Sequence, residues 1–351
     1  MERQLFSKYP SIELSDKDFV VNKIRNHGYE HIKYAITEKI HGSNTQITYD
    51  CVTGEFEYAK RSCPLEEGEH CYNVQQCFEN LKGNVIDLVK YLTPTLPKEL
   101  DAVKVFGEIF GGSYPHPDVK RNVHASRVQK GVFYSPDNHW LAFDIAYRLK
   151  GDETFTFLGA SDFFLACDVC NIPTVPLLKV ANNLTEALEY PNNGSSVVYK
   201  NYNLPEITSE ENIMEGVVIR PFDKDLWMGQ SRVILKNKND HFKEKSHVVR
   251  PEVTQNYSEN LNNALAEAAT YITVNRVNNV ISHEGEVTEN DIGRLIGLVA
   301  KDALDEYLQE SKTYPLLEKP ECGIVKKMFA RQFAGLVRQE VYRRLSEECK
   351  A

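Results

Sequence analysis

Lys39 stands in the stretch ITEKIHGSNTQ, residues 36 to 46, where a His-Gly turn follows it. A lysine amine is a nucleophile only when it is unprotonated, although the ordinary pKa of lysine is about 10.4. A single lysine before a glycine turn is usually a solvated hairpin residue. Lys39 is therefore a candidate for covalent chemistry only if distant segments bring the other groups that such chemistry needs.

Further segments with the pattern of strands carry charged side chains that strand geometry would direct toward a common cleft. Arg61 in YAKRS is a planar donor suited to a phosphate or a ribose. Glu108 precedes a glycine pair in KVFGEIFGG, and Glu215 opens EGVVIRP. In RVILKNK, Lys236 and Lys238 share one face of an extended chain and lie about 7 Å apart. Two amines on one face repel each other unless they share an anion.

The cationic groups suit attack of an amine on the α-phosphate of a nucleotide, with displacement of pyrophosphate. Positive charges at Arg61, Lys236 and Lys238 would disfavour the ammonium form of Lys39. The same cations would neutralise charge on the phosphates during an in-line displacement. These segments together therefore favour a nucleotide site around Lys39.

Two carboxylates and an aromatic ring complete this candidate site. Glu108 and Glu215 would hold the ribose hydroxyls and a hydrated metal ion, since Mg²⁺ prefers oxygen ligands and keeps several waters. Phe143 in WLAFDI offers a flat surface on which a base could stack. The sequence thus predicts a covalent reaction between a lysine and a nucleotide.

The size and composition of the chain are those of an ordinary globular protein. Its 351 residues suggest about two domains, and 42% apolar with 26% charged residues indicate no disordered bias. The N-terminal stretch lacks the apolar core of a secretory signal, and no apolar run is long enough for a bilayer. We expect a soluble, intracellular protein. Its eight cysteines are expected to be free thiols, because Cys167 and Cys170 lack a second pair of zinc ligands.

Two basic clusters stand out against a net charge of -9, which alone argues against a bulk polyanion binder. Residues 236–250 contain Lys or Arg at five positions. The second cluster lies within the expected loop from Ser113 to Asn138 and consists of Lys120, Arg121, Arg127 and Lys130. A solvated face and a binding surface, for RNA or for a partner protein, are equally open interpretations of this loop.

The pattern of the chain changes near residue 255. Short apolar or alternating runs bounded by Gly, Pro, Asn and Asp indicate strands from residue 34 to about 240, interrupted by a few helical stretches. Residues 190–203 are typical of a surface excursion. Beyond residue 255 the apolar spacing is helical, and Thr288 is a candidate helix cap. We expect three parts, which are a sheet-rich domain over 1–240, a basic linker over 241–256 and a helical domain over 257–351.

The motifs resemble those of the covalent nucleotidyltransferase superfamily and occur in its order. K-x-H-G-x-N from Lys39 to Asn44 resembles motif I, and FGEIFGG, FDI, EGVVIRP and K-N-K at 236–238 resemble motifs III, IIIa, IV and V. His41 in place of aspartate, with the helical C-terminal region, resembles the RNA ligase 2 family, which includes a phage RNA ligase and the trypanosomatid RNA-editing ligases. The resemblance implies an α+β fold with an ATP-grasp-like nucleotidyltransferase domain of antiparallel sheets and flanking helices, followed by an all-helical C-terminal domain.

The resemblance also implies a role for each motif residue. Lys39 would become covalently adenylated, and Glu215 would bind a divalent ion, Mg²⁺ or Mn²⁺, directly or through water. The other ATP-binding positions would be Glu38, Ile40, His41, Asn44, Arg61, Glu108, Phe143, Lys236 and Lys238. The positions that would handle RNA are Arg220, Arg276, Asp302 and Glu306. By helical spacing alone, Asp302 and Glu306 are simply surface carboxylates one turn apart.

The implied function is an ATP-dependent RNA ligase that seals 3′-hydroxyl and 5′-phosphate RNA ends, with nicked duplex RNA as the expected substrate. DNA ligases and capping enzymes share the lysine chemistry, but they typically have aspartate at the position of His41 and an OB-fold after the catalytic domain. Two further hypotheses are a non-catalytic nucleotide- or RNA-binding relative and a two-domain protein in which these clusters are structural. RNA repair, tRNA healing and editing all remain open as pathways.

Overall fold

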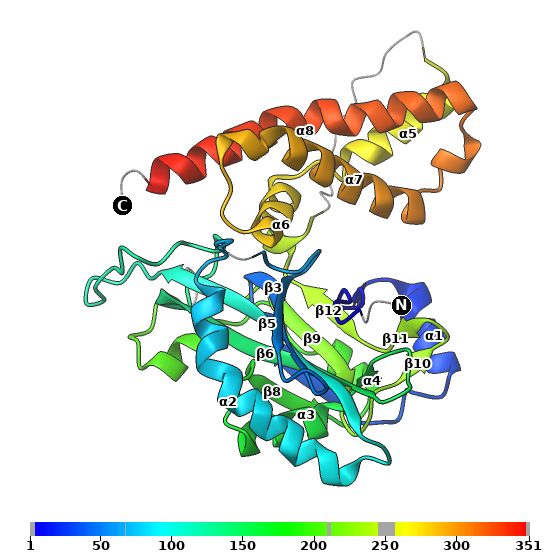
Figure 1. Ribbon diagram of the computed structural model, residues 1–351. Coiled ribbons are helices and arrows are strands. Elements are labelled where there is room, and N and C mark those ends of the chain that lie inside the picture. The colour runs from blue at the N-terminus through cyan, green and yellow to red at the C-terminus, as the bar shows by residue number, and fades with distance from the viewer. Residues whose placement is uncertain (1–3, 67, 209–211, 245–256, 349–351) are drawn as a thin grey trace. The chain divides into compact units, whose positions relative to one another are not determined.

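The computed structural model describes residues 4–66, 68–208, 212–244 and 257–348. The chain divides into an N-terminal unit, residues 1–239, and a C-terminal unit, residues 240–351 (Figure 1). Of the expected basic linker, Asp240–Phe242 form the short helix η3 at the start of the second unit, and residues 245–256 lie outside the described residues.

The first sheet of the N-terminal unit has the strand order β1-β12-β9-β2-β8. Its strands are β1 (Glu13–Leu14), β12 (Leu235–Lys238), β9 (Gly216–Pro221), β2 (Tyr34–Glu38) and β8 (Leu177–Ala181). Only the β1/β12 pair is parallel. Apolar side chains of α1 (Asp18–Asn26) and α4 (Leu184–Leu188) share a buried cluster with this sheet. One face of the sheet is therefore closed by helices.

The second sheet is antiparallel throughout and has the order β4-β3-β5-β6-β7. Its strands are β4 (Phe56–Lys60), β3 (Ser43–Asp50), β5 (Leu100–Ser113), β6 (Ser135–Leu149) and β7 (Thr156–Phe157). The helices α2 (Val74–Leu92) and α3 (Ala160–Val169) cover one of its faces (Figure 1). In α2 the buried positions Phe78, Leu81, Val85 and Leu88 recur at helical spacing, which explains why this helix packs on the sheet.

Short elements complete the N-terminal unit. These are η1 (Thr93–Thr95), η2 (Val198–Tyr202) and a small hairpin of β10 (Trp227–Met228) and β11 (Ser231–Arg232). The expected architecture of antiparallel sheets with flanking helices is confirmed.

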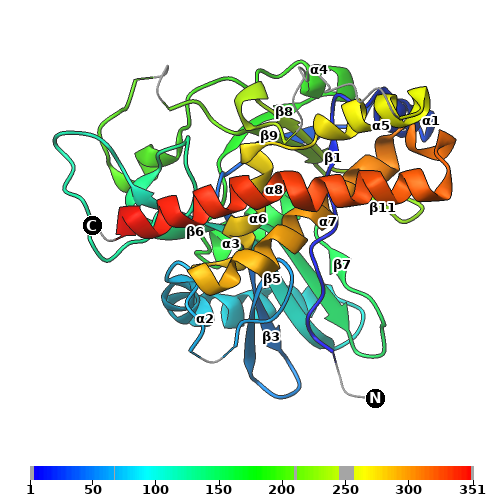
Figure 2. The ribbon, with the colours of Figure 1, turned by 90° about the horizontal axis from the view of Figure 1, so that it is seen from above.

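The described residues of the C-terminal unit form helices and no strands. They are η3 and then α5 (Glu259–Ala269), α6 (Val274–Glu284), η4 (Glu289–Asp291), α7 (Ile292–Glu310), η5 (Tyr314–Leu316) and α8 (Lys319–Glu348). The long α8 lies along α7 (Figure 2), and their apolar faces share one buried cluster. Thr288 forms a capping box with Asp291 immediately before α7, as the sequence predicted. The all-helical C-terminal region is confirmed.

The seven cysteines within the described residues carry free thiols, as expected. Cys167 and Cys170 are buried at the end of α3, and nowhere in the described parts do three His, Cys, Asp or Glu side chains gather as metal ligands. No helix among these residues has the length and apolar character needed to cross a bilayer.

Candidate active site

Lys39 lies in the turn that joins the two sheets of the N-terminal unit. β2 of the first sheet ends at Glu38, and β3 of the second sheet begins at Ser43. The Lys39 amide donates to the carbonyl oxygen of Gly216 at 2.9 Å, which continues the pairing of β2 with β9. At Gly42 an added Cβ would lie 2.2 Å from the Ile109 carbonyl oxygen, so no side chain fits there. The turn is therefore fixed against both sheets.

Glu215 is the centre of the candidate site because three basic side chains converge on its carboxylate. Lys39 Nζ lies 2.7 Å from Oε2, Lys238 Nζ lies 3.1 Å from Oε1, and His41 Nδ1 lies 3.4 Å from Oε2. Burial would raise the pKa of Glu215, but Lys39, Lys238 and His41 outweigh it and hold that pKa well below the ordinary range. The Glu215 carboxylate is therefore ionised and attracts the basic side chains around it.

The start of β9 positions Glu215 through its neighbours. The Asn239 amide donates to the Glu215 carbonyl oxygen at 2.8 Å, and Lys238 pairs with Gly216 across the two strands. Gly216 has φ +148°, and a Cβ there would lie 2.1 Å from the Asn237 carbonyl oxygen. Only glycine therefore fits between Glu215 and the strand that carries Lys238.

Glu108 faces the same region from β5. It lies directly opposite Asn44 of β3 in the strand register, so the two side chains share one face of the sheet. Burial and the nearby Glu215 raise the pKa of Glu108 to about 8, against opposing effects of Lys39 and Arg61. Glu108 is thus largely protonated at neutral pH, and the cations outnumber the anions. Such an excess of positive charge suits a triphosphate.

Glu38 presents an unpartnered acceptor beside Lys39. Its side chain is only 1% exposed, and Oε2 accepts the Val197 amide at 3.0 Å. Oε1 is buried and has no hydrogen-bond partner among the described residues. Burial raises the pKa of Glu38 to about 7, against the hydrogen bonds from Ser196 and Val197. A buried acceptor without a donor is costly, so this atom is a candidate to bind a ligand donor.

Sequence reasoning missed the residues that support Glu38. The stretch 190–203 was expected to be a surface excursion, but Ser196 and Val198 in it are buried. Asn192 of the same stretch donates to the Lys238 carbonyl oxygen at 3.0 Å. Apolar Val197 and Val198 after two serines were the one signal in the sequence that this stretch returns to the protein interior.

Tyr134 and Gln129 were also missed, and both contact the turn that carries Lys39. The Tyr134 hydroxyl accepts the His41 amide at 2.8 Å, and Gln129 Nε2 donates to the Gly42 carbonyl oxygen at 3.4 Å. Tyr134 is buried, with its ring edge against Phe110 at a centroid distance of 5.1 Å. Side-chain bonds to a backbone have no periodic signature, so the sequence offered no signal for either residue.

We expect Tyr134→Phe to slow reaction at Lys39 by roughly 10- to 100-fold in kcat, with a small effect on nucleotide KM. The ring would keep its packing, but the His41 amide would be left unsatisfied at a cost of about 1–3 kcal/mol. The measurement is the rate of covalent nucleotide labelling at several nucleotide concentrations. Tyr202→Phe is the matched control, because that ring also packs near Phe110 and its hydroxyl has no hydrogen bond within the described structure. Equal losses in both variants would contradict a positioning role for Tyr134.

Phe143 lies at an irregularity of the second sheet. The β5/β6 register runs from Phe106 opposite Asp144 to Gly107 opposite Ala142, which leaves Phe143 without a partner in a bulge. Bulges re-aim side chains beside functional sites. The ring is partly buried and meets Tyr9 edge-on at 5.0 Å. Its stacking on a base remains a prediction.

The remaining ATP-binding positions differ in exposure. Ile40 is buried, Arg61 and Lys236 are partly exposed, and the structure records no contact between Lys236 and Glu215. Lys236 and Lys238 follow each other at two-residue spacing in β12 as expected, but Lys238 is the one that shares the Glu215 carboxylate.

The arginines predicted to handle RNA are buried, each within its own unit. Arg220 is buried, and its Nη1 pairs with Asp144 Oδ1 at 2.7 Å. In the C-terminal unit, Arg276 is 1% exposed and is paired with Asp302 and Glu306. Both guanidiniums form internal ion pairs, which gives each arginine a structural partner. Contact of Arg220 and Arg276 with RNA stays a prediction. For Asp302 and Glu306, the pairing with Arg276 supplies a structural reason for their helical spacing.

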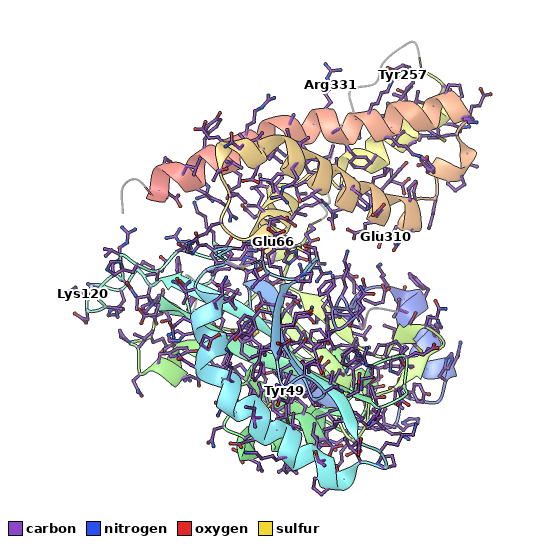
Figure 3. All side chains as sticks on the ribbon, viewed as in Figure 1. Tyr49, Glu66, Lys120, Tyr257, Glu310 and Arg331 are labelled. Carbon is purple, nitrogen blue, oxygen red and sulfur yellow. The ribbon has the colours of Figure 1, made fainter. Side chains whose placement is uncertain are left out.

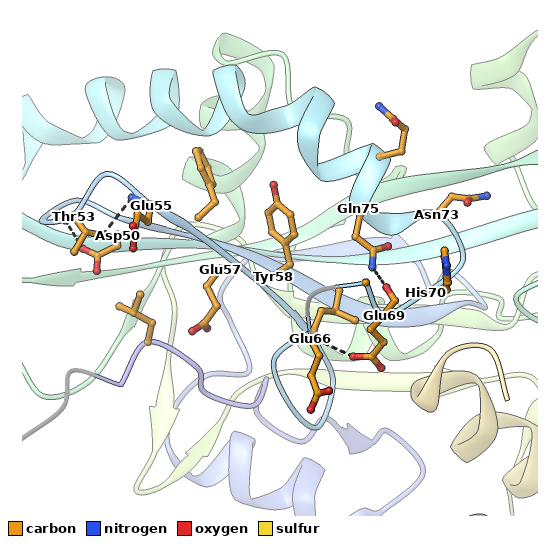
Figure 4. Close-up of a pocket in the computed structure, with 15 residues that line it drawn as sticks. Asp50, Thr53, Glu55, Glu57, Tyr58, Glu66, Glu69, His70, Asn73 and Gln75 are labelled. Atoms are coloured by element: carbon orange, nitrogen blue, oxygen red, sulfur yellow. Dashed lines mark hydrogen bonds between the residues drawn. The ribbon is translucent and has the colours of Figure 1, made fainter. Parts of the chain in front are cut away.

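A pocket of about 810 Å³ lies elsewhere on the N-terminal unit (Figure 4). Its lining includes the carboxylates of Asp50, Glu55, Glu57, Glu66 and Glu69, and none of the candidate site residues. Such a lining repels phosphates, so this pocket is not a nucleotide site.

Comparison with known proteins identifies the class of the chain. A family model described as RNA ligase matches residues 32–238, more than half of the chain, and a model described as T4 RNA ligase 2 C-terminal matches residues 254–335. The chain therefore belongs to the RNA ligase family. Within that family, the C-terminal match relates it to RNA ligase 2.

Individual relatives include two mitochondrial RNA-editing ligases of Trypanosoma brucei brucei. RNA-editing ligase 2 is 30% identical over 168 residues, which cover 44% of this chain and 40% of the relative. RNA-editing ligase 1 is 26% identical over 367 aligned positions, which cover 87% of this chain and 76% of the relative. Among solved structures, a variant of Naegleria gruberi RNA ligase with ATP and Mn aligns at a TM-score of 0.41 and 16% identity, covering 68% of this chain and 59% of that one.

Proposed function

We propose that this protein is an ATP-dependent RNA ligase that seals 3′-hydroxyl and 5′-phosphate ends of RNA, in particular nicks in duplex RNA. The observation that carries the proposal is the convergence of Lys39, His41 and Lys238 on the buried carboxylate of Glu215. Membership in the RNA ligase family supports the choice of acceptor. The free form keeps Lys39 Nζ beside a carboxylate, so the amine must leave that ion pair before it can attack a phosphate.

The residues present fit ATP as the nucleotide. The unpartnered Oε1 of Glu38 can accept the exocyclic amine of adenine, whereas guanine presents a carbonyl oxygen at the corresponding position. Glu108 and Asn44 lie opposite each other where the ribose hydroxyls would bind, and Lys238 and Arg61 supply charge for the phosphates. Glu215 is the group that would hold a divalent ion, which when bound neutralises phosphate charge and orients the leaving group.

Sealing by way of Lys39 takes three successive transfer steps at phosphorus. In the first, deprotonated Nζ attacks the α-phosphorus of ATP, the bond to the bridging oxygen breaks, and pyrophosphate leaves. In the second, an oxygen of the RNA 5′-phosphate attacks the same phosphorus, which releases Lys39 Nζ to take up a proton again. In the third, the RNA 3′-hydroxyl loses its proton, attacks the 5′-phosphorus and displaces AMP. Lys39 is therefore needed as a nucleophile only in the first transfer.

We expect Glu38→Gln to weaken discrimination between ATP and GTP. If the amide oxygen keeps the Val197 bond, the amide nitrogen takes the place of Oε1 and a donor faces the base. A mismatched hydrogen bond costs about 1–3 kcal/mol, which corresponds to a rise of roughly 5- to 150-fold in the KM for ATP. Labelling with α-labelled ATP and GTP measures this change, and an unchanged ratio of the two would count against Glu38 as the base-reading group.

A pH series gives the same assignment a second check. Because burial raises the pKa of Glu38 to about 7, its carboxylic acid form loses a proton as the pH rises through that value. The resulting carboxylate is the stronger hydrogen-bond acceptor. The KM for ATP should therefore fall across this range in the wild type relative to Glu38→Gln. Equal pH profiles in both proteins would show that Glu38 does not titrate against the nucleotide.

The experiment that tests the proposed function uses the wild-type chain with Mg²⁺ and α-labelled ATP. Label that stays on the denatured chain supports the covalent step, and its absence would overturn the proposal. The labelled protein is then offered nicked duplex RNA and a nicked DNA duplex of the same sequence. Transfer to RNA and sealing of it support an RNA ligase, whereas equal sealing of the DNA would indicate a ligase without RNA preference.

A further inference from the structure

The connection between β5 and β6, residues 114–134, follows the strand that carries Glu108 and returns to the turn that carries Lys39. Glu108 and the last residue of β5, Ser113, are five positions apart, which is about 17 Å along a strand. The returning part of the connection brings Gln129 to the Gly42 carbonyl oxygen and Tyr134 to the His41 amide. The connection therefore begins about 17 Å from Glu108, on the strand that carries it, and ends in contact with the turn that carries Lys39.

The outer part of this connection is attached to its own strands at several points. The Val128 amide donates to the Gly111 carbonyl oxygen at 3.2 Å, and Asn138 Nδ2 donates to the Ser126 carbonyl oxygen at 2.8 Å. Gly112 has φ +83°, and a Cβ on it would lie 2.2 Å from that same Ser126 oxygen. These contacts fix where the segment 115–127, here named the basic tip, stands relative to β5.

The basic tip presents two adjacent cations without a partner among the described residues. Lys120 and Arg121 are exposed, and neither has an ion pair or hydrogen bond with another described residue. Figure 3 shows Lys120 at the outer end of the connection. Arg127 is also exposed and its Nη2 donates to Ser113 Oγ at 2.8 Å. The charged residues of the tip are these three cations and Asp118, in a chain whose net charge is -9.

Several other exposed lysines on this unit form ion pairs with surface carboxylates. Lys90 pairs with Asp87 at 2.7 Å, Lys98 pairs with Asp152 at 3.1 Å, and Lys150 pairs with Glu99 at 3.0 Å. The tip differs because two cations without such carboxylates are adjacent there, whereas Lys33 and Lys224, which also have no ion pair among the described residues, each stand alone in the sequence. Val123 is its one exposed large hydrophobic residue, so the tip lacks the aromatic and apolar anchors typical of a protein interface.

We propose that the basic tip binds the phosphate backbone of the RNA substrate and holds it over the Lys39 turn. The inference rests on the proposed function and names a surface that this function would use. Adjacent Lys and Arg side chains without an apolar anchor are suited to phosphates, whose contacts fix position rather than sequence. Since the same connection touches His41 and Gly42, RNA bound at the tip is held by the element that supports the nucleophile.

The test replaces these two outermost cations by neutral residues in the full chain, as Lys120→Gln/Arg121→Gln. A plot of the logarithm of the association constant for nicked duplex RNA against the logarithm of the salt concentration has a negative slope. Loss of two phosphate contacts should make this slope less steep by about 1.8 and weaken binding roughly 10- to 30-fold near 0.15 M salt. Sealing of limiting RNA should fall in parallel. Labelling by ATP without RNA should stay at the wild-type rate, which also shows that the variant is folded.

The matched control is Lys33→Gln/Lys224→Gln. Both side chains are exposed and have no ion pair within the described parts of the chain. They lie near the ends of β2 and β9 that are farthest from Lys39, where Tyr34 pairs with Pro221. We expect RNA affinity and salt slope of this control to match the wild type. An unchanged slope in the tip variant, or an equal loss in the control, would overturn the proposal. Absence of ATP labelling in the wild type would instead overturn the proposed function, so the two failures are distinguishable.

Discussion

Lys39→Arg should lose covalent nucleotide labelling by more than about 10³-fold while the N-terminal unit stays folded. Arginine keeps a positive charge beside Glu215, so the ion pair that fills the site in the free protein can persist. Its guanidinium remains protonated at all accessible pH values and cannot act as the nucleophile. The measurement is label on the denatured chain after incubation with Mg²⁺ and α-labelled ATP.

The control for this variant is a substrate that bypasses the first transfer. RNA that already carries a 5′-linked AMP needs no free amine, because only the 3′-hydroxyl attacks in the last transfer. We expect Lys39→Arg to seal such RNA within about 10-fold of the wild-type rate, since the other groups of the site remain. Loss of this sealing as well would show that the substitution disturbs the site. Label retained on Lys39→Arg would show that another residue is the nucleophile.

The strands that carry the candidate site were predictable because each has a local signature. NTQITYD, FEYAKR and EGVVIRPF alternate or run apolar between turn residues, and they coincide with β3, β4 and β9. Two-residue spacing put Lys236 and Lys238 in one strand, and the structure has both in β12. Strand period and turn residues act within a few positions, which is the range over which a single sequence is informative.

The distribution of the cations within the site was not predictable in the same way. Nothing local distinguishes Lys238, which shares the Glu215 carboxylate, from Lys236, which has no recorded contact with it. The bulge at Phe143 depends on how β6 pairs with β5, and register is a property of two strands. Tyr134 acts on a backbone amide 93 positions away. Each of these features is fixed by tertiary contacts rather than by a pattern in one segment.

Arg220 illustrates how a strand can be predicted while the surroundings of one of its side chains cannot. Its place in EGVVIRP beside the motif residues suggested contact with a nucleic acid, and β9 does contain it. Strand alternation, however, places it on the buried side, where Asp144 and the Phe163 ring surround its guanidinium. The resemblance supplied the position, and only the packing shows that Asp144 pairs with its guanidinium. Contact of Arg220 with RNA stays a prediction.

Asp144→Asn should be among the most destabilising single substitutions in the N-terminal unit. The carboxylate is fully buried, accepts the Tyr9 hydroxyl at 2.8 Å, and pairs with both Arg220 and Arg232. Removing its charge would leave two buried guanidiniums with far less compensation, at a cost of about 3–5 kcal/mol. Burial would raise the pKa of Asp144, but Arg220 and Arg232 lower it below the ordinary value. This contribution to stability is therefore present above the ordinary pKa of aspartate and is lost as the pH falls through the lowered value.

Tryptophan fluorescence during urea unfolding measures this loss in the intact chain. Both tryptophans, Trp140 and Trp227, belong to the N-terminal unit, so their signal reports the unfolding of that unit. Asp152→Asn is the matched control, because its pair with Lys98 is exposed on both sides and should contribute less than about 1 kcal/mol. At acidic pH near the lowered pKa of Asp144, the difference in stability between Asp144→Asn and the wild type should shrink. A difference that stays constant down to that pH would mean that the packing of the side chain, rather than its charge, stabilises the unit.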